Sequence, residues 1–417
     1  MLIYRSFKTE LDPTRAQIQL LAKHCGAARF AYNWGLARRI SAYRASREVL
    51  TSIDLHRELN RQKKSGLAWL YEVSKCAPQE SLRDLDLAFQ LFFRSRGARR
   101  NRFPKFKKRK DALGSFRLNG VIKVTETHIQ LPRLRRIRLK ERGYLPRDTH
   151  ILSATVSERA GRWFVSLRVR MEINPQGNSG PRVGVDLGIQ KLAVTSDNEV
   201  FTNPRPMKTL QLKVRRLQRS LARSKRGSSN CRRKRIRLAK VHLRIANIRS
   251  DSQHKMTTRL TKTKSGLVIE DLAVSALQRS RRLGMSLTDA GLREIRRQLT
   301  YKAQWYGCEL LVVHRLFPSS QLCSVCGEIN RALTLANRLF TCPACGNRCD
   351  RDLNAARNLM LAASSAERSN ASGAGSSGRD APAKLPAVKQ EPAIVDPENG
   401  KVIGVSRRCR NNSPSVS

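Results

Sequence analysis

Hydrophobic and polar residues alternate from Leu2 to Glu10, which is the period of a strand with one buried face. The spacing becomes helical after Asp12 and Pro13, where Asp12 fits a helix cap and Pro13 fits the first helical turn. A second helical pattern follows Pro78 and leads into a strongly basic stretch, Arg94 to Lys110. The N-terminal region is therefore predicted to be a strand that leads into a helical region.

A β-rich segment follows, because short alternating runs occupy Ser115 to Ile173 and are broken by Gly120, Gly143 and Gly161. Such a series of short strands predicts a small β-barrel or sandwich. The segment from Pro175 to Pro181 has the composition of a linker, and a new domain is expected after it.

The region after the linker has the pattern of an α/β domain. Arg182 to Gly188 and Leu192 to Val194 predict two paired strands, and two helices rich in Arg and Lys follow, each with one apolar stripe. A break at residues 227 to 230 makes an antiparallel helical hairpin with a basic outer face the simplest interpretation. The elements expected next are a strand at Leu267–Glu270, a helix at Thr288–Tyr306 stopped by Gly307, and a strand at Leu310–Val313.

The C-terminal region, beyond about Ala363, is rich in Ser, Gly, Ala and Pro with scattered charges. Such a composition buries too little apolar surface to offset the entropy lost on ordering, so residues 363–417 are expected to be a disordered tail. We assign no chemistry to it.

The charge of the chain is strongly unbalanced, with 82 Lys and Arg against 32 Asp and Glu and a formal net charge of +50. An excess of this size opposes compaction by self-repulsion unless a polyanion screens it, which favours nucleic acid as the partner over a small acidic metabolite. A solvated basic surface, as in many ribosome-associated proteins, is the alternative. The charge therefore indicates nucleic-acid binding and leaves the chemistry open.

Nothing near the N-terminus has the pattern of a secretory signal, because Arg5, Lys8 and Glu10 interrupt any apolar run. No stretch reaches the length of a transmembrane helix, so no membrane partner is expected. We expect a reducing cell interior, the cytoplasm of a bacterium or archaeon, in association with the nucleoid. In that setting the ten cysteines are better explained as metal ligands and buried thiols than as disulfides.

Two cysteine pairs, Cys323-x-x-Cys326 and Cys342-x-x-Cys345, have the spacing of a zinc ribbon. Each pair places two thiolates on one knuckle, and a glycine directly after each pair permits the tight turn. Four thiolates make a closed tetrahedral site, so the metal would be structural. Unmetallated core cysteines are the alternative, and Cys349, which lies off the pattern, is interpreted as an ordinary thiol.

Three acidic residues stand at the ends of predicted elements. Asp186 follows an apolar strand between glycines, Glu270 ends another strand with Asp271 beside it, and Asp352 opens a predicted helix. Taken singly, each is better explained as a local cap that bonds its own backbone.

The order of the elements favours a catalytic role for the three together. Strand, strand, basic helices, strand, helix, strand, helix is the order of an RNase H-like sheet, in which the ends of the first and fourth strands converge with the start of a late helix. Three carboxylates meeting there can hold two Mg²⁺ ions about 4 Å apart, one activating a water and the other stabilising the leaving 3′ oxygen of a phosphodiester. Carboxylates suit Mg²⁺ because it is a hard cation that retains several waters. Asp350 is a candidate to assist from nearby, and Asp271 is a candidate cap.

Aromatic residues interleave with the cations of the basic stretch at Phe103, Pro104 and Phe106. Such a mixture suits a surface that stacks bases while neutralising phosphates, and a partly buried aromatic pair flanked by solvated lysines explains it equally well. The candidate nucleic-acid-binding residues, here and on the first basic helix, are Arg102, Lys105, Lys107, Lys108, Arg109, Arg215, Arg216 and Arg219. Neither His254 nor His314 has the partner pattern of a catalytic histidine.

Several segments together resemble the TnpB family, transposon-encoded RNA-guided DNA endonucleases related to the single-effector CRISPR nucleases with one RuvC domain. The segments nearest the candidate site are Gly184–Gly188, Val268–Leu272, Pro318–Cys323 and Asp350–Ala356. Others are Gly26–Phe30, Asn33–Trp34, Ala88–Phe89, Phe92–Phe93, Phe103–Lys107, Leu299–Ala303 and Trp305–Gly307. The resemblance covers roughly residues 1 to 360.

The resemblance implies an α/β multidomain protein. Residues 182–318 and 350–362 would form an RNase H-like RuvC nuclease domain, with the zinc ribbon inserted as residues 319–349. Residues 1–10 and 111–174 would form a wedge-like N-terminal β-barrel, into which residues 11–110 insert as a helical recognition lobe. Asp186, Glu270 and Asp352 carry over as the catalytic triad and magnesium ligands, and Cys323, Cys326, Cys342 and Cys345 as ligands of one zinc ion.

The family's activity implies the partners. A guide RNA transcribed from the transposon end would pair with target double-stranded DNA, and the protein would read a short motif beside the target. We expect a monomer bound to its RNA, although nothing in the sequence fixes the oligomeric state.

Two alternatives to a cleaving enzyme were considered. A guided repressor of the same architecture would have lost cleavage, and the intact carboxylates at all three positions favour the endonuclease. A transposase that joins strands directly would need a catalytic Tyr with a His pair or a recombinase Ser, and neither signature is found.

Overall fold

The computed structural model describes residues 1–94, 103–108, 114–147, 149–274, 284–334 and 337–371, with three two-residue strands further on. The chain divides into two compact units. One consists of Met1–Asn174 with Leu212–Arg244, and the other of Pro175–Gln211 with Ile245–Ser417. No helix in the described part of the chain is long and apolar enough to cross a membrane.

The first unit contains a seven-stranded sheet in the order β2-β6-β7-β1-β5-β4-β3. Its strands are β1 (Leu2–Asp12), β2 (Ser115–Leu118), β3 (Lys123–Val124), β4 (His128–Leu131), β5 (Arg135–Leu139), β6 (His150–Arg159) and β7 (Arg162–Glu172). β1 lies at the centre, antiparallel to β7 from Leu2↔Glu172 to Leu11↔Trp163. The sequence predicted a small β-barrel or sandwich here, and within the described residues no pairing joins the end strands β2 and β3. β3 is only two residues long, and α3 packs against β2.

Four helical elements accompany this sheet: α1 (Arg15–Ser46), α2 (Ser52–Ser65), the 3₁₀ helix η1 (Ala68–Glu72) and α3 (Cys76–Arg94). α1 begins two residues later than predicted, because Thr14 and not Asp12 is its cap. The Thr14 hydroxyl accepts from the Gln17 amide at 3.3 Å, and the Gln17 side chain accepts from the Thr14 amide at 2.9 Å, which completes a capping box. Asp12 instead continues β1 and pairs with Arg138 of β5.

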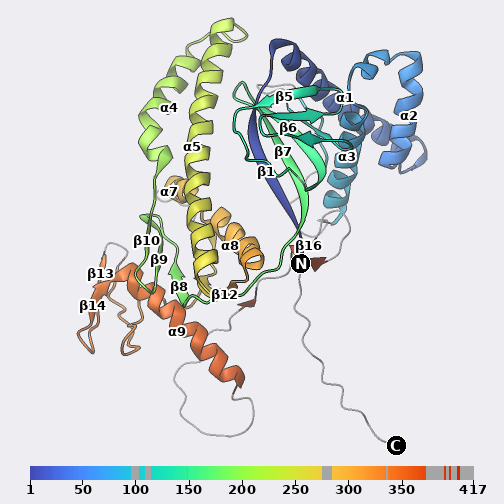
Figure 1. The fold of residues 1–417 in the computed structure, drawn as a ribbon. Helices are drawn as coiled ribbons and strands as arrows, with labels where there is room; N and C mark the ends of the chain where they lie inside the picture. The colour runs from blue at the N-terminus through green and yellow to red at the C-terminus, as the bar shows by residue number, and fades with distance from the viewer. Residues whose placement is uncertain are drawn as a thin grey trace, which may run out of the picture. The chain divides into compact units, whose positions relative to one another are not determined.

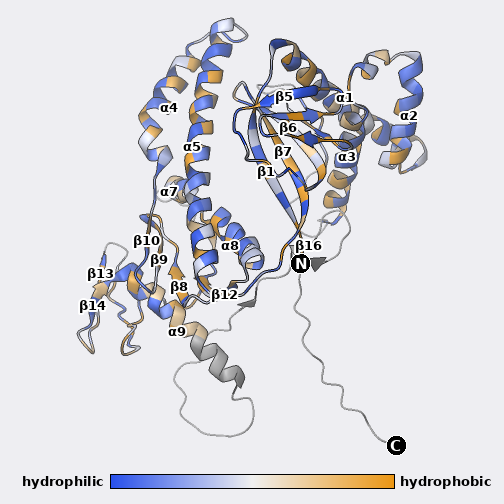
Figure 2. Ribbon diagram, in the orientation of Figure 1, coloured by the Kyte–Doolittle hydropathy of each residue, from blue (hydrophilic) through white to orange (hydrophobic). Residues whose placement is uncertain are grey.

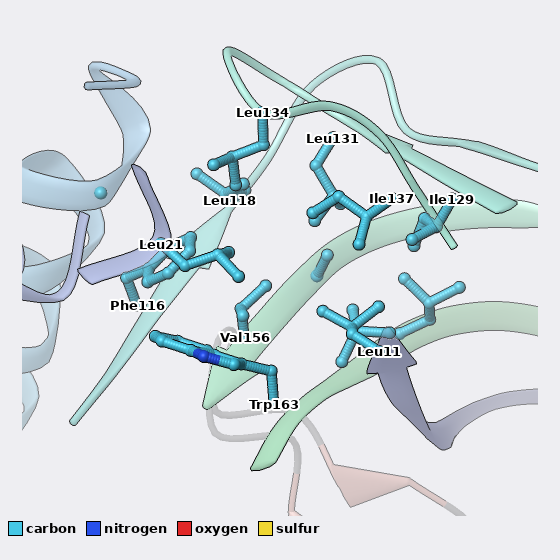
Figure 3. Packing of buried hydrophobic residues seen from close by; sticks show 14 of the residues in the cluster. Leu11, Leu21, Phe116, Leu118, Ile129, Leu131, Leu134, Ile137, Val156 and Trp163 are labelled. Atoms are coloured by element: carbon cyan, nitrogen blue, oxygen red, sulfur yellow. The ribbon is translucent and has the colours of Figure 1, made fainter. Parts of the chain in front are cut away.

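The core of the first unit lies between the sheet and the start of α1. Leu21 of α1 is fully buried and gathers with Phe116, Val156 and Trp163 of the sheet (Figure 3). A separate apolar cluster joins α1, α2 and α3 through Leu36, Leu55 and Leu82.

The second unit contains a six-stranded sheet in the order β10-β9-β8-β11-β12-β15 (Figure 1). Its strands are β8 (Arg182–Asp186), β9 (Lys191–Thr195), β10 (Val200–Thr202), β11 (Gly266–Glu270), β12 (Glu309–Val313) and β15 (Lys389–Gln390). β8, β11 and β12 are parallel, whereas β9, β10 and β15 run antiparallel to their neighbours. The predicted strands are therefore confirmed, with β10 added after β9.

The helices that follow β7 along the chain are α4 (Pro206–Ala222), α5 (Ser229–Thr263), α7 (Gly284–Ala290), α8 (Leu292–Tyr306) and α9 (Arg351–Ala371), and residues 212–244 of α4 and α5 belong to the first unit. α4 and α5 form the predicted basic hairpin, and hydrophilic and hydrophobic positions alternate along both (Figure 2). The helix predicted at Thr288–Tyr306 is broken at Gly291, whose φ of +67° is left-handed. Gln253 of α5 donates to the carbonyls of Ala290 at 2.7 Å and Gly291 at 3.3 Å, which compensates the break.

Two short hairpins complete the described structure. β13 (Leu339–Thr341) pairs with β14 (Arg348–Asp350), and β16 (Ile394–Val395) pairs with β17 (Val402–Ile403). Ala363, near which the sequence predicted a disordered tail to begin, is buried in the core, because α9 continues to Ala371.

Candidate active site and metal centre

Asp186 and Glu270 end two neighbouring parallel strands. Val185 of β8 pairs with Ile269 of β11, so the next residue of each strand is one of the two acids. Both side chains are half-buried. Parallel strands expose their carboxyl ends at one edge of the sheet, which is where such sheets place ligands. The structure therefore brings these two predicted residues to the same edge.

Asp352 reaches this edge because α9 packs closely on β8 (Figure 1). A Cβ atom on Gly184 would lie 1.9 Å from the Ala356 carbonyl oxygen of α9, so only glycine permits this approach. Asp352 lies one helical turn before Ala356, in the first turn of α9. Gly184 thus fixes the distance between the strand that carries Asp186 and the helix that carries Asp352.

The charges of the three carboxylates influence one another. Burial, together with the negative charges of Asp352 and Glu270, raises the pKa of Asp186 to about 7, and Arg351 opposes this rise. Burial also raises the pKa of Glu270, against a hydrogen bond that the Ser319 hydroxyl donates to Glu270 Oε2 at 3.2 Å. Carboxylates held together at this cost are typical of a cation-binding or catalytic site.

The acidic neighbours of the triad have different roles. The Asp350 carboxylate accepts from the amides of Asp352 at 2.9 Å and Leu353 at 3.2 Å and so caps α9. Lys191 Nζ lies 2.9 Å from Asp350 and 3.8 Å from Asp352. Asp271 forms ion pairs with Arg296 and, at 3.2 Å, with Arg315.

The four predicted cysteines converge, and their sulfur atoms all lie within 4.8 Å of one another. Cys323 and Cys345 are 3.7 Å apart, and Cys326 and Cys342 are 3.5 Å apart. Zn–S bonds of about 2.3 Å in a tetrahedron require S···S distances of this size, so the residues fit zinc. The glycine amide after each pair donates to the carbonyl of the pair's first cysteine, at 3.0 Å for Gly327 and 3.2 Å for Gly346.

Cys349 stays outside this cluster. It is half-buried, and its sulfur accepts a 3.8 Å hydrogen bond from the Asn347 side chain, which also reaches Cys323. In the described part of the chain, the four-cysteine cluster is the one compact group of three or more acidic, histidine or cysteine ligands.

The candidate nucleic-acid-binding residues divide into three groups. Arg102 and Arg109 lie outside the described residues. Lys105 and Lys108 are exposed, while Lys107 is held by two backbone hydrogen bonds to Asn33 and by its ammonium lying 3.8 Å from the centre of the Tyr32 ring. Arg215, Arg216 and Arg219 are exposed on α4, and none of the three pairs with a carboxylate among the described residues.

The aromatic residues of the basic stretch fit both sequence interpretations in part. Phe103 makes edge contacts with Phe89 and Phe92, each with ring centres 5.5 Å apart, yet it remains 45% exposed. Phe106 is 50% exposed and Pro104 is buried. The stretch is therefore anchored on α3 and still presents aromatic surface.

Sequence reasoning gave no role to Lys191, Ser319 or Arg351, although all three contact the site or shift its charges. Ser319 and Arg351 lie in segments that carry the family resemblance, which was the available signal. The two histidines have local roles: the His254 carbonyl accepts from Lys302, and His314 Nδ1 accepts from the Leu316 amide.

Three family models match successive parts of the chain. A model described as "Probable transposase" matches residues 154–281, and one described as "Cas12f1-like, TNB domain" matches residues 293–359. A third, "Helix-turn-helix domain", matches residues 1–48, which here consist of β1 and the single long helix α1.

Whole-chain relatives agree with these matches. A Streptomyces pristinaespiralis protein named "Putative RNA-guided DNA endonuclease" is 36% identical over 370 residues, covering 86% of this chain and 89% of the relative. Escherichia coli "Putative RNA-guided DNA endonuclease InsQ" is 33% identical over 377 residues, covering 86% and 92%. A Cas12f1 chain from a complex with guide RNA and target DNA shares the fold, with a TM-score of 0.52 at 11% identity over 86% of this chain and 98% of its own. The protein therefore belongs to the TnpB family.

Proposed function

We propose that the protein is an RNA-guided, Mg²⁺-dependent DNA endonuclease encoded by a transposable element. The observation that carries the proposal is that Asp186 and Glu270 end the paired strands β8 and β11, and that Asp352 lies in the first turn of the helix α9 that packs on β8. The names of the whole-chain relatives support RNA guidance and DNA as the substrate. The wedge and recognition parts would lie in the first unit and the RuvC site with its ribbon in the second, while residues 212–244 of the predicted nuclease domain belong to the first unit.

The residues of the site would divide the work as follows. Asp186, Glu270 and Asp352 would hold two Mg²⁺ ions, which supply an activated water and a stabilised leaving oxygen when bound. Asp350 keeps the first turn of α9 in place as its cap, and Lys191 balances part of the negative charge. Arg351, which lowers the pKa of Asp186, favours the ionised form that binds a cation. The four cysteines would hold one zinc ion as a structural element.

The nucleic acid would be held by the basic surfaces. A guide RNA from the transposon end and the target double-stranded DNA are the proposed partners. Arg215, Arg216 and Arg219 on α4 and the lysines at 105, 107 and 108 are proposed phosphate contacts, because exposed cations release counterions from a polyanion. Arg102 and Arg109 are proposed on sequence alone.

The test compares Asp186→Asn with Asp271→Asn in the protein copurified with its RNA, on DNA that matches the guide. Asp186→Asn removes one charge from the three carboxylates and should lower Mg²⁺-dependent cleavage by about a thousandfold or more, with RNA binding changed less than about twofold. Asp271→Asn removes the adjacent ion-paired carboxylate and should cleave within about threefold of the unchanged protein. Normal cleavage by Asp186→Asn would refute the triad, and matched binding without cleavage by the unchanged protein would indicate a guided repressor.

A further inference from the structure

The segment that leads into the first cysteine pair is fastened to α9 by two asparagines. Asn354 Nδ2 donates to the Leu322 carbonyl at 2.6 Å, and its Oδ1 accepts from the Ser324 amide at 3.0 Å. Asn358 Nδ2 donates to the carbonyls of Ser319 at 2.8 Å and Leu322 at 2.6 Å. Both asparagines are fully buried, so these bonds form away from water. We call residues 319–324 the ribbon entry.

The ribbon entry also contacts the carboxylate site. Ser319, which is 5% exposed, donates to Glu270 Oε2 at 3.2 Å. Glu270 Oε1 accepts no hydrogen bond from the described residues. The contact thus restrains one oxygen of Glu270 and leaves the other for a cation.

The same face of α9 makes a further attachment at the helix start. Arg351 donates to the Thr334 carbonyl at 2.9 Å and to the Ser320 hydroxyl at 3.3 Å. Arg351, Asn354 and Asn358 have the i, i+3, i+7 spacing of one helix face. Asp352 belongs to the first turn of this helix, so the attachments that hold the ribbon entry also hold the turn that carries a catalytic residue.

Apolar contacts would be enough to bury this face of α9. Phe317 and Leu322 already pack with Val313 and Leu359 in one cluster beside it. Hydrogen bonds between buried amides and carbonyls add direction, because each fixes a distance and an angle and each costs free energy when broken. Two buried asparagines with four such bonds therefore fix the register between α9 and the ribbon entry.

We propose that the ribbon entry sets the geometry of two of the three catalytic carboxylates. Ser319 is a positioning residue for Glu270, and Asn354 and Asn358 are positioning residues for the first turn of α9 with Asp352. The zinc ribbon then has a role beyond its own folding, because a bound zinc ion would order Cys323, which belongs to the ribbon entry. This inference rests on the proposed nuclease function.

The test uses Mn²⁺ as a probe for Mg²⁺, with the free ion measured by electron paramagnetic resonance in the full-length protein bound to its RNA. RNA also binds Mn²⁺. The quantity compared is therefore the Mn²⁺ binding that is present in the unchanged protein and lost in Asp186→Asn. Ser319→Ala should weaken that binding by about tenfold, and Ser319→Thr, which restores the hydroxyl, should return it to within about threefold. Both variants should keep one zinc per chain. Cleavage by Ser319→Ala should need more Mg²⁺ than cleavage by the unchanged protein and should approach the unchanged rate at saturating Mg²⁺.

A second pair of variants tests the asparagines. Asn358→Asp loses both donated hydrogen bonds without a change of side-chain size. Asn330→Asp is the control. It loses one similar bond within the ribbon, which the Asn330 side-chain amide donates to the Thr341 carbonyl at 2.9 Å. Asn358→Asp should weaken the Asp186-dependent Mn²⁺ binding severalfold, whereas Asn330→Asp should not change it.

Unchanged Mn²⁺ binding in folded, zinc-loaded Ser319→Ala would overturn the proposal, even if Asn358→Asp fails to fold. Equal weakening by Asn330→Asp would overturn the role of the asparagines. If the nuclease assignment itself is wrong, Asp186→Asn will bind as much Mn²⁺ as the unchanged protein, which appears before any Ser319 variant is examined.

Discussion

The cysteine cluster and the carboxylate site both hold negative groups close together, but they are assembled differently. The cluster draws its four ligands from residues 323 to 345, two on each knuckle, and their sulfurs contact one another. The carboxylates lie more than eighty residues apart in sequence and meet only because β8, β11 and α9 pack together. A local site encloses its ion, whereas a site built from distant elements can leave room for water and a phosphodiester.

The two sites also differ in how their negative charge is compensated. Four thiolates are stabilised as a group once they share one zinc ion. The carboxylates have only partial compensation: Lys191 lies 3.8 Å from Asp352, and burial with the neighbouring carboxylates raises the pKa of Asp186 to about 7 although Arg351 lowers it. Changes to the cysteine cluster are therefore expected to lower the stability of the fold. Changes to the carboxylate site are expected to lower activity by altering its geometry or its protonation.

Loss of the zinc ligand Cys323 should produce the largest effect. Cys323→Ser should abolish zinc binding and lower the free energy of unfolding by several kcal/mol, because the binding energy of a structural zinc is folding energy. Cys349→Ser is the matched control, since Cys349 lies beside the cluster without belonging to it. Metal analysis should find one zinc per chain in the control and none in Cys323→Ser. A stable, zinc-loaded Cys323→Ser protein would show that the cluster is not closed by these four thiolates.

The next largest effect is expected at the contact between β8 and α9. Gly184→Ala places a methyl group against the backbone of Ala356 and must displace α9, so cleavage should fall about a hundredfold with zinc content unchanged. Gly26→Ala is the control, because a Cβ atom there meets nothing within 4 Å. Full activity in Gly184→Ala would mean that the carboxylates need no fixed spacing, which would remove the main difference between the two sites.

The two sites differ in how far the sequence predicts them. Cysteine spacing predicts the cluster directly, since each knuckle folds from adjacent residues. The positions of Asp186 and Glu270 at strand ends were predictable, because each strand is an apolar run that stops at an acidic residue. Asp352 needed the order of elements as well.

The remaining contacts depend on tertiary packing and leave no local pattern. Ser319 reaches Glu270 across 49 residues of sequence, and the break at Gly291 is compensated by Gln253 from another helix. A glycine inside a helical pattern and a serine before a cysteine are each too common to predict these roles.

The smallest effect expected is on pH dependence, and it concerns Asp186 alone. Its pKa of about 7 lies above the ~4 of an unfolded aspartate, so the metal-free folded protein retains the proton more tightly and loses stability as pH rises from about 4 through 7. Mg²⁺ needs the ionised carboxylate, so its affinity should fall by up to about tenfold per pH unit below 7 and level off above it. Thermal unfolding with and without Mg²⁺ should therefore show a stabilisation that is larger at pH 8 than at pH 6. In Asp186→Asn this difference should disappear, and an equal stabilisation at both pH values in the unchanged protein would show that its carboxylates do not share one field.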